Sequence, residues 1–146
     1  MTTPANIQIG RSLFDGIEAH DLSQWEAVLA NNFTASYPSA RPALNMGLNK
    51  EQAKAYNSIF IPAFPDLHFD YRDVMTDGDK IVYFWEATGT HDGPLALPTG
   101  TIPPTHKKAT IPGVLYVELK NGKIVREETY WNQVELLTQL GLMPGA

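Results

Sequence analysis

The chain has 146 residues, with 11 basic and 16 acidic side chains, a formal charge of −5 and no cysteine. This length suits one domain spanning residues 1–146, the missing cysteines exclude disulfides and thiolate metal sites, and the negative charge argues against nucleic acid as a partner. No stretch approaches the ~20 apolar residues of a membrane span, and the N-terminus does not resemble a signal peptide, so we expect a cytoplasmic protein with no membrane contact.

The first half of the chain has the periodicity of helices. Apolar residues recur at spacings of three and four between Ile9 and Ile17, as one buried helix face requires. A second helix is predicted over residues 22–29, where Asp21 can act as the N-cap and Gln24 follows three residues later, as in a capping box.

A short strand and a third helix follow. Residues 33–37 alternate between apolar and polar side chains, which favours a strand. The third helix is predicted to begin near Asn49, with Gln52 three residues later as a second capping box. Pro62 and Pro65 end it, because proline lacks the amide hydrogen that a helix interior needs.

The second half indicates long strands joined by tight turns. Runs rich in β-branched and aromatic residues, or alternating in polarity, cover residues 67–76, 79–91, 107–120 and 122–131. Asp77-Gly78 and Asn121-Gly122 are typical hairpin turns between such runs. A short final helix follows and is closed by Gly141.

The order of these elements predicts the fold class. Helices that precede a run of antiparallel strands indicate an α+β fold, here three N-terminal helices packed on one face of a curved antiparallel sheet. Long strands must bend to wrap around helices, and we expect the bends at Gly89, Pro112 and Gly113.

The segment HDGPLALPTGTIPPTH, residues 91–106, lies between two predicted strands and contains four prolines and two glycines. Long loops inside compact domains are often functional, which favours a rim or lid over the mouth of a pocket. A rigid hairpin connection between the two strands is the alternative interpretation.

Three stretches, taken with the order of elements, carry a resemblance to a known family: AFPDLHFDYRDVMTDGDKIV, ATGTHDGPLALPTG and NGKIV…YWNQVELLTQLGL. The chain resembles the cone-shaped fold of nuclear transport factor two, and within that fold the SnoaL-like polyketide cyclases, also called ester cyclases. The resemblance covers about residues 5–143. The Gly-Thr-His-x-Gly run and the terminal Gln-Leu-Gly are its more specific motifs.

This resemblance implies an apolar cavity between helices and sheet that binds an apolar or aromatic small molecule. The family cyclases close a polyketide ring by an intramolecular aldol reaction, without metal or cofactor. A buried carboxylate removes a proton next to a carbonyl, and apolar walls raise its pKa by disfavouring the charged form. Members of the family commonly form homodimers through the exposed face of the sheet.

The family's functional positions can be located in this sequence. Its Gly-x-His histidine falls on His91, and its acid/base aspartate falls on Thr129, five residues after Ile124 of Gly-Lys-Ile. A histidine of some cyclases falls on Leu115, and an acidic residue before the last helix becomes Asn132. The scaffold therefore matches the family, while the main catalytic carboxylate does not.

Strand alternation identifies a substitute for this carboxylate. If Thr129 faces the cavity, Val125, Glu127 and Trp131 face it too, because side chains alternate with a period of two. Three residues of the same strand then face away: Arg126, Glu128 and Tyr130. Glu127 is thus the carboxylate nearest to the lost aspartate, about 6–7 Å along the strand from Thr129.

The strand that leads to His91 supplies further candidates. Alternation groups Tyr83 and Trp85 on one face, where the rings would form a flat wall for a planar ligand or, equally, part of a packed core. His91 has a reference pKa of about 6.5, which suits a general acid or base. A structural histidine that caps the strand end is the alternative.

We therefore predict His91 and Glu127 as catalytic residues. Five residues are predicted to bind the ligand: Tyr83, Trp85, Leu115, Thr129 and Trp131. No metal site is predicted, because the four histidines at positions 20, 68, 91 and 106 are scattered. An epoxide-hydrolase-like cluster of Asp70, Arg72 and Asp73 is disfavoured, since these residues do not share one strand face.

Two hypotheses about function remain. The first is a cofactor-independent enzyme on an apolar, carbonyl-bearing small molecule: an aldol-type cyclase, isomerase or dehydratase with a relocated acid/base. The second is a non-catalytic small-molecule binding protein of the same fold, because Thr129, Leu115 and Asn132 occupy positions where the family does acid/base chemistry.

Overall fold

The structure is a computed structural model, and it describes residues 4–38, 46–97 and 100–143. In chain order the elements are α1 (Pro4–Glu18), the 3-10 helix η1 (Leu22–Ala27), β1 (Leu29–Ser36), α2 (Lys50–Ser58), α3 (Phe60–Ala63), β2 (His68–Asp77), β3 (Lys80–Thr90), β4 (Leu95–Leu97), β5 (Gly100–Ile102), β6 (Lys108–Lys120), β7 (Lys123–Trp131) and α4 (Gln133–Gln139). No helix in these described residues is long and apolar enough to cross a membrane.

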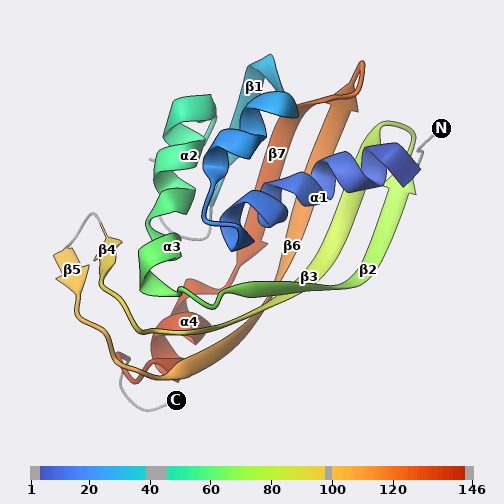
Figure 1. Cartoon of the computed structure of the whole chain (residues 1–146). Helices are drawn as coiled ribbons and strands as arrows, with labels where there is room; N and C mark the ends of the chain where they lie inside the picture. Colours follow the sequence, from blue (N-terminus) through green and yellow to red (C-terminus); the bar gives the residue numbers. More distant parts are fainter. Residues whose placement is uncertain (1–3, 39–45, 98–99, 144–146) are drawn as a thin grey trace.

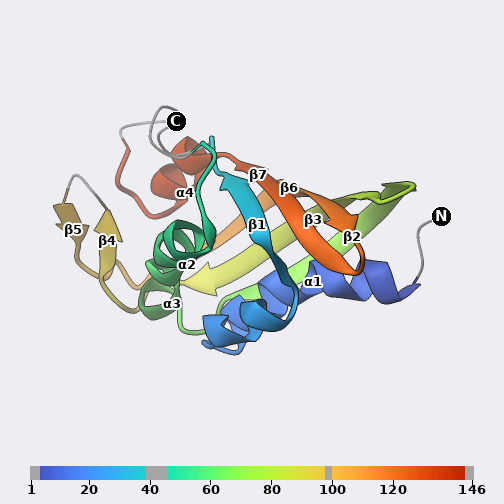
Figure 2. The same ribbon diagram turned by 90° about the horizontal axis from the view of Figure 1, so that it is seen from above.

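Five strands form one curved sheet in the order β1-β7-β6-β3-β2, and β4 pairs with β5 in a separate hairpin. The helices α1, α2 and α3 lie on the same side of the large sheet (Figures 1 and 2). The predicted α+β class is confirmed, with two corrections. Four helical segments, not three, precede β2. β1 runs parallel to β7, so the sheet is mixed, and α2 and α3 lie in the chain between the two edge strands β1 and β2.

The helix predicted over residues 22–29 forms over residues 22–27 as the short 3-10 helix η1. The last predicted residue, Leu29, instead begins β1, four residues before the predicted strand. Asp21 does cap η1, but it accepts from the Ser23 amide, so no capping box forms with Gln24. The apolar residues from Trp25 onward enter the core from η1 and β1.

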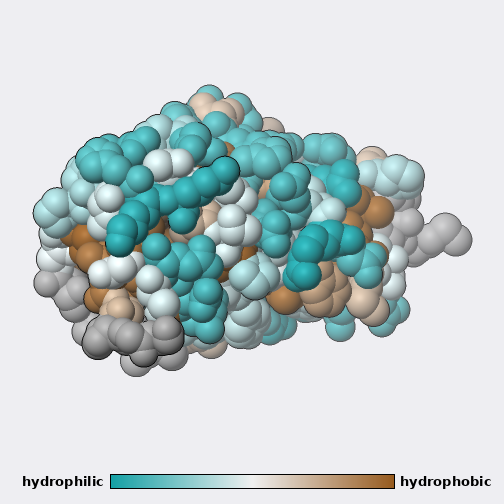
Figure 3. Space-filling model, turned by 90° about the horizontal axis from the view of Figure 1, so that it is seen from below, coloured by the Kyte–Doolittle hydropathy of each residue, from teal (hydrophilic) through white to brown (hydrophobic). Residues whose placement is uncertain are grey.

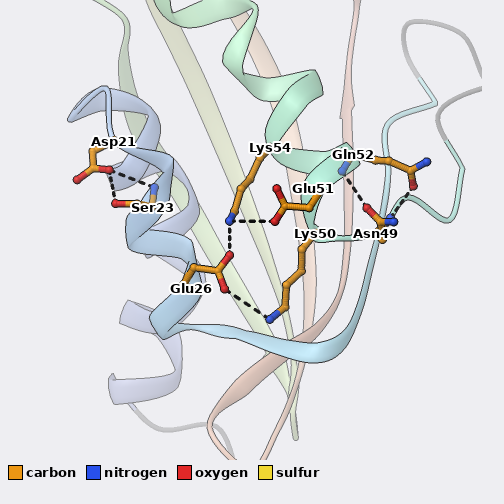
Figure 4. A network of polar contacts seen from close by, with 8 residues as sticks. All are labelled: Asp21, Ser23, Glu26, Asn49, Lys50, Glu51, Gln52 and Lys54. Carbon is orange, nitrogen blue, oxygen red and sulfur yellow. Dashed lines mark hydrogen bonds and ion pairs between the residues drawn. The ribbon is translucent and has the colours of Figure 1, made fainter.

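The third predicted helix forms as two pieces, α2 and α3, with Ile59 between them. Its start is confirmed: Asn49 and Gln52 make the reciprocal bonds of a capping box, drawn in Figure 4. Lys54 of α2 binds Glu26 of η1, which ties the two elements together (Figure 4). This contact helps to hold α2, whose inner face carries site residues, against the rest of the chain.

The sheet changes register at three positions, one of which lies between Leu29 and Thr34, where β1 pairs with β7. Arg72 is the extra residue where β2 pairs with β3, and Val125 is the extra residue where β7 pairs with β6. The pairing of β3 with β6 is regular throughout. No bulge therefore lies at Gly89, Pro112 or Gly113 in this pairing, and the bends expected at these residues stay a prediction.

The core fills the space between the helices and the concave face of the sheet. Its main cluster includes Leu13 and Phe14 from α1 and Trp25 from η1, all at most 5% exposed. Phe14 stacks on Phe69 of β2 with ring centroids 3.9 Å apart. On the outside, Figure 3 shows a largely hydrophilic face with apolar side chains in small separate patches.

Residues 91–106 contain the β4–β5 hairpin, which is the structure that the hairpin interpretation predicts. Leu95 of β4 is buried in a second core cluster between Phe64, Ile111 and Leu136. Gly93 packs so closely on α3 that a Cβ would lie 1.9 Å from the Pro62 carbonyl oxygen. The hairpin is thus fixed at its base, and its role as a lid stays a prediction.

Candidate active site

A cavity lies between the helices and the concave face of the sheet. The space open to the centres of water-sized molecules is about 100 Å³. Eight of its 17 lining residues are aromatic, and they come from α1, α2, α3 and the sheet. Four lining residues carry a hydroxyl or amide group: Tyr37, Tyr56, Asn57 and Thr129. The cavity therefore suits an apolar, planar ligand with few polar atoms.

Three of these polar groups, those of Tyr37, Asn57 and Thr129, are connected through one buried carboxylate, Glu127, which is 3% exposed. The Thr129 hydroxyl donates to Glu127 Oε1 across 2.9 Å, and the Tyr37 hydroxyl donates to Oε2 across 3.1 Å. The Tyr37 oxygen in turn accepts from Asn57 Nδ2 at 2.9 Å. Glu127 thus sits at the centre of a hydrogen-bonded cluster that reaches the cavity through its partners.

The environment of Glu127 changes its acidity. Burial raises the pKa of Glu127 from 4.5 to about 7, and the hydrogen bonds from Thr129 and Tyr37 oppose this rise. Burial also raises the pKa of Tyr56 to about 12 and that of Tyr37 well above its usual range. Both tyrosines therefore stay neutral near pH 7, where Glu127 titrates.

The bulge in β7 decides which of its side chains face inward. Ile124 is fully buried, whereas Val125, the extra residue, is only half-buried, so the inward placement predicted for Val125 is wrong. The alternation resumes after the bulge. The predicted inward placement of Glu127 and Thr129 is confirmed, since both are under 9% exposed.

The family model for SnoaL-like polyketide cyclases matches residues 8–140 of this sequence. The chain belongs to the SnoaL-like polyketide cyclase family. The predicted resemblance is thereby confirmed. A comparison with curated proteins gives no match.

Solved structures show the same fold as this SnoaL-like chain. A protein of Jannaschia sp. CCS1, described as a SnoaL-like polyketide cyclase, is similar at 23% identity and a TM-score of 0.78, covering 99% of both chains. AclR of Streptomyces galilaeus, described as a hydroxylase, has 18% identity and a TM-score of 0.81, covering 99% of this chain and 90% of its own. IdmH of Streptomyces antibioticus, described as a polyketide cyclase, has 20% identity and a TM-score of 0.78, covering 93% and 98%.

The SnoaL-like cavity brings together some of the predicted ligand-binding residues and not others. Trp85, Thr129 and Trp131 line it. Tyr83 and Leu115 are fully buried in the core and do not line it. Tyr83 instead donates its hydroxyl to the Ile7 carbonyl of α1 at 2.7 Å. No ligand tests these roles, so ligand binding by all five residues stays a prediction.

His91 is fully buried but does not line the cavity. Its Nδ1 accepts from the Thr105 amide at 3.2 Å and lies 3.0 Å from the Thr105 hydroxyl, across the base of the β4–β5 hairpin. Since Nδ1 accepts from the amide, the ring proton is on Nε2. Burial lowers the pKa of His91, which favours this neutral form. The contacts fit a histidine that holds the hairpin, and its catalytic role stays a prediction.

Three polar residues that line the cavity were missed by the sequence analysis: Tyr37, Tyr56 and Asn57. Tyr37 directly follows β1, and its ring stacks on Tyr56 with centroids 4.3 Å apart. Asn57 lies four residues after the buried Ala53, on the inward face of α2. That spacing is the signal that could have found Asn57, because residues four apart share a helix face.

Among the residues that the structure describes, titratable side chains elsewhere form no second site of this kind. Asp70, Arg72 and Asp73 are all exposed, as a solvated strand face requires. His68 pairs on the surface with Asp70 and Glu18. Within the described ranges, no group of three or more histidine, aspartate or glutamate residues is placed to hold a metal ion.

Proposed function

We propose that this protein is a cofactor-independent acid/base enzyme acting on an apolar, carbonyl-bearing small molecule. The candidate reactions are aldol-type cyclisation, isomerisation and dehydration, each of which begins with removal of a proton next to a carbonyl. The observation that supports this proposal is Glu127, a buried carboxylate with a pKa of about 7, placed behind an apolar cavity. Family membership supports the same class of chemistry.

A carboxylate with these properties suits general base catalysis. A base is most effective when its pKa lies near the working pH, because it is then both available and strong enough to take a proton. An exposed glutamate has a pKa of about 4.3 and is a much weaker base. The surrounding side chains therefore raise the basicity of Glu127 by between two and three orders of magnitude.

The apolar walls would bind and orient the substrate. Trp131 packs edge-on to Phe60 with centroids 5.8 Å apart, and Trp85 packs edge-on to Phe14 at 5.4 Å. Such fixed rings present broad apolar surfaces to a planar ligand. His91 would act from the hairpin side, as a group that either holds the cavity rim or assists the proton transfer.

Exchange of substrate hydrogen for deuterium tests this function without knowledge of the product. Planar aromatic ketones are incubated with the protein in D₂O, and exchange next to the carbonyl is followed by NMR. We expect catalysed exchange that falls at least about 100-fold in Glu127→Gln, the usual effect of removing a general base. His91→Ala is measured in parallel. Full exchange in both variants would show that the assigned roles are wrong.

A non-catalytic binding protein is the second candidate, and one observation favours it. Thr129 occupies the position of the family aspartate, and Glu127 does not itself line the cavity. In that case ligands bind and are recovered chemically unchanged, and deuterium enters them no faster than it does without the protein at any pH. The same exchange experiment therefore separates the two candidates.

Association of two copies through the outer face of the sheet is the expectation from the family. On this face Arg126 binds Glu118 and Glu128, so the side chains on it are largely paired within one chain. Light scattering after size-exclusion chromatography would report the mass in solution. A mass of one chain, 16.2 kDa, would contradict the dimer.

A further inference from the structure

The carboxylate of Glu127 is separated from the cavity by its own hydrogen-bond partners. Both of its oxygens are occupied, Oε1 by the Thr129 hydroxyl and Oε2 by the Tyr37 hydroxyl. Thr129 and Tyr37 line the cavity, whereas Glu127 does not. A ligand in the cavity therefore meets a hydroxyl group before it meets the carboxylate.

The two hydroxyls differ in what they can still offer to a ligand. Asn57 Nδ2 donates to the Ala53 carbonyl oxygen at 2.8 Å, and since that oxygen can only accept, the orientation of the amide is fixed. Its second hydrogen is donated to the Tyr37 oxygen, whose own hydrogen is donated to Glu127. Tyr37 thus both accepts and donates within the protein. Thr129 only donates, so its oxygen is free to accept from a ligand.

We propose that Thr129 is the group that contacts the reacting part of the substrate and relays its proton to Glu127. This inference rests on the proposed function. In the step, the substrate C–H bond breaks and its proton bonds to Thr129 Oγ1, while the original hydroxyl proton of Thr129 moves to Glu127 Oε1. The electron pair of the C–H bond stays on the substrate as an enolate. No oxidant, metal or further reactant is required for the balance.

The relay gives the cavity two recognition states. When Glu127 is ionised, Thr129 donates to it and presents an acceptor oxygen to the ligand. When Glu127 is protonated, it donates to Thr129, whose own hydrogen can then turn toward the ligand. A ligand hydroxyl should therefore be preferred in the first state and a ligand carbonyl in the second.

Glu127 is the residue whose protonation changes between these two states, because the groups that face it do not change theirs near pH 7. Tyr37 after β1 and Tyr56 on α2 are the titratable groups acting on it in the described part of the chain, and both stay neutral near pH 7. Its strand neighbours, Ala35 on β1 and Val117 on β6, are apolar and buried. Asn57 does not titrate.

Three matched naphthalene ligands test the relay. They are 2-naphthol, which offers a hydroxyl donor, 2-acetylnaphthalene, which offers only a carbonyl acceptor, and 2-methylnaphthalene, which offers neither. Their dissociation constants are measured by fluorescence from about pH 5.5 to 8.5, a range that brackets the Glu127 titration. Relative to 2-methylnaphthalene, we expect 2-naphthol to gain about 3- to 10-fold in affinity as pH rises, and 2-acetylnaphthalene to lose as much, because one hydrogen bond changes.

Variants of Thr129 distinguish a relay through its hydroxyl from direct contact between the ligand and Glu127. Thr129→Val should remove both opposing pH responses while Glu127 still titrates, which ¹³C NMR of its carboxyl carbon follows, and Thr129→Ser should restore them. Thr129→Ala serves in the same way if valine disturbs the strand. Responses that persist in these variants, or wild-type affinities that do not change with pH, would overturn the relay. The proposed function has its own criterion, the loss of deuterium exchange in Glu127→Gln, so the two ideas fail separately.

Discussion

Gly113 of β6 lies beneath the indole of Trp85 on the neighbouring strand β3. The two residues are paired in the sheet, and a Cβ on Gly113 would come within 2.1 Å of Trp85 Cζ2. The glycine therefore makes room for an aromatic side chain that lines the cavity and packs edge-on against Phe14 and Phe69. Gly113, where we expected a bend in the sheet, thus sets the position of the Trp85 side chain in the cavity wall.

The first prediction concerns this contact. Gly113→Ala should destabilise the protein by about 1–3 kcal/mol, because the added methyl group displaces the indole from a packed position. Urea unfolding measures the change. In the double variant with Trp85→Leu the alanine should cost much less than it does alone, since the clashing ring is gone. Equal costs in both backgrounds would show that the indole does not depend on the glycine.

The second prediction concerns stability and pH. The pKa of Glu127 is raised to about 7 in the folded protein from 4.5, so the folded state holds its proton more tightly than the unfolded state. Its contribution to stability is then fully present below about pH 4.5 and is lost as pH rises through about 7. Between these limits the wild type should lose up to about 3 kcal/mol relative to Glu127→Gln. Urea unfolding of both proteins at a series of pH values measures the difference, and parallel curves would contradict it.

The third prediction concerns the hydroxyl of Tyr37. Tyr37→Phe removes a hydrogen bond that stabilises the ionised form of Glu127, so the pKa of Glu127 should rise further, by about 1 unit. The titration is followed by ¹³C NMR of the glutamate carboxyl carbons. Tyr56→Phe is the matched control, because it removes a neighbouring hydroxyl that is not bonded to Glu127. A similar shift in both variants would point to a general change in packing.

The fourth prediction concerns His91 and the β4–β5 hairpin. His91→Ala leaves the Thr105 amide without its acceptor, so that amide should exchange with solvent about 10-fold faster or more, as the loss of one hydrogen bond implies. Hydrogen exchange by NMR measures this directly. His106→Ala is the control, because the His106 side chain is 72% exposed and its ring bonds to Asp92 at the surface, while its backbone amide bond to the His91 carbonyl is kept in the variant. Unchanged exchange at Thr105 in His91→Ala would show that another contact holds the hairpin.

Local sequence signals located most of the elements. The helix face from Ile9 to Ile17, the capping box at Asn49 and the hairpin at Asn121-Gly122 depend on neighbouring residues alone, and each is present in the structure. The helix predicted over residues 22–29 ends early, at Ala27, for a tertiary reason. Its apolar residues serve η1 and then β1, which pairs with β7, a strand nearly 100 positions later in the chain.

The site was predictable only in part for the same reason. Alternation along one strand is a local property, so the inward placement of Glu127 and Thr129 followed from the sequence. The bulge at Val125 depends on pairing with β6 and was not foreseeable from β7 alone. Tyr37 and Asn57 belong to other elements, and nothing local shows that they converge on Glu127.

The sequence by itself therefore determined the family, the fold class and the residue that carries the carboxylate, because motifs and periodicities are written along the chain. Only the tertiary structure decided what that carboxylate can do. Burial among side chains from β1, α2 and β7 raises its pKa to about 7, and the two hydroxyls that hold it stand between it and the cavity. Solvation and hydrogen bonding depend on residues brought together from distant positions, so they become visible when the chain is folded.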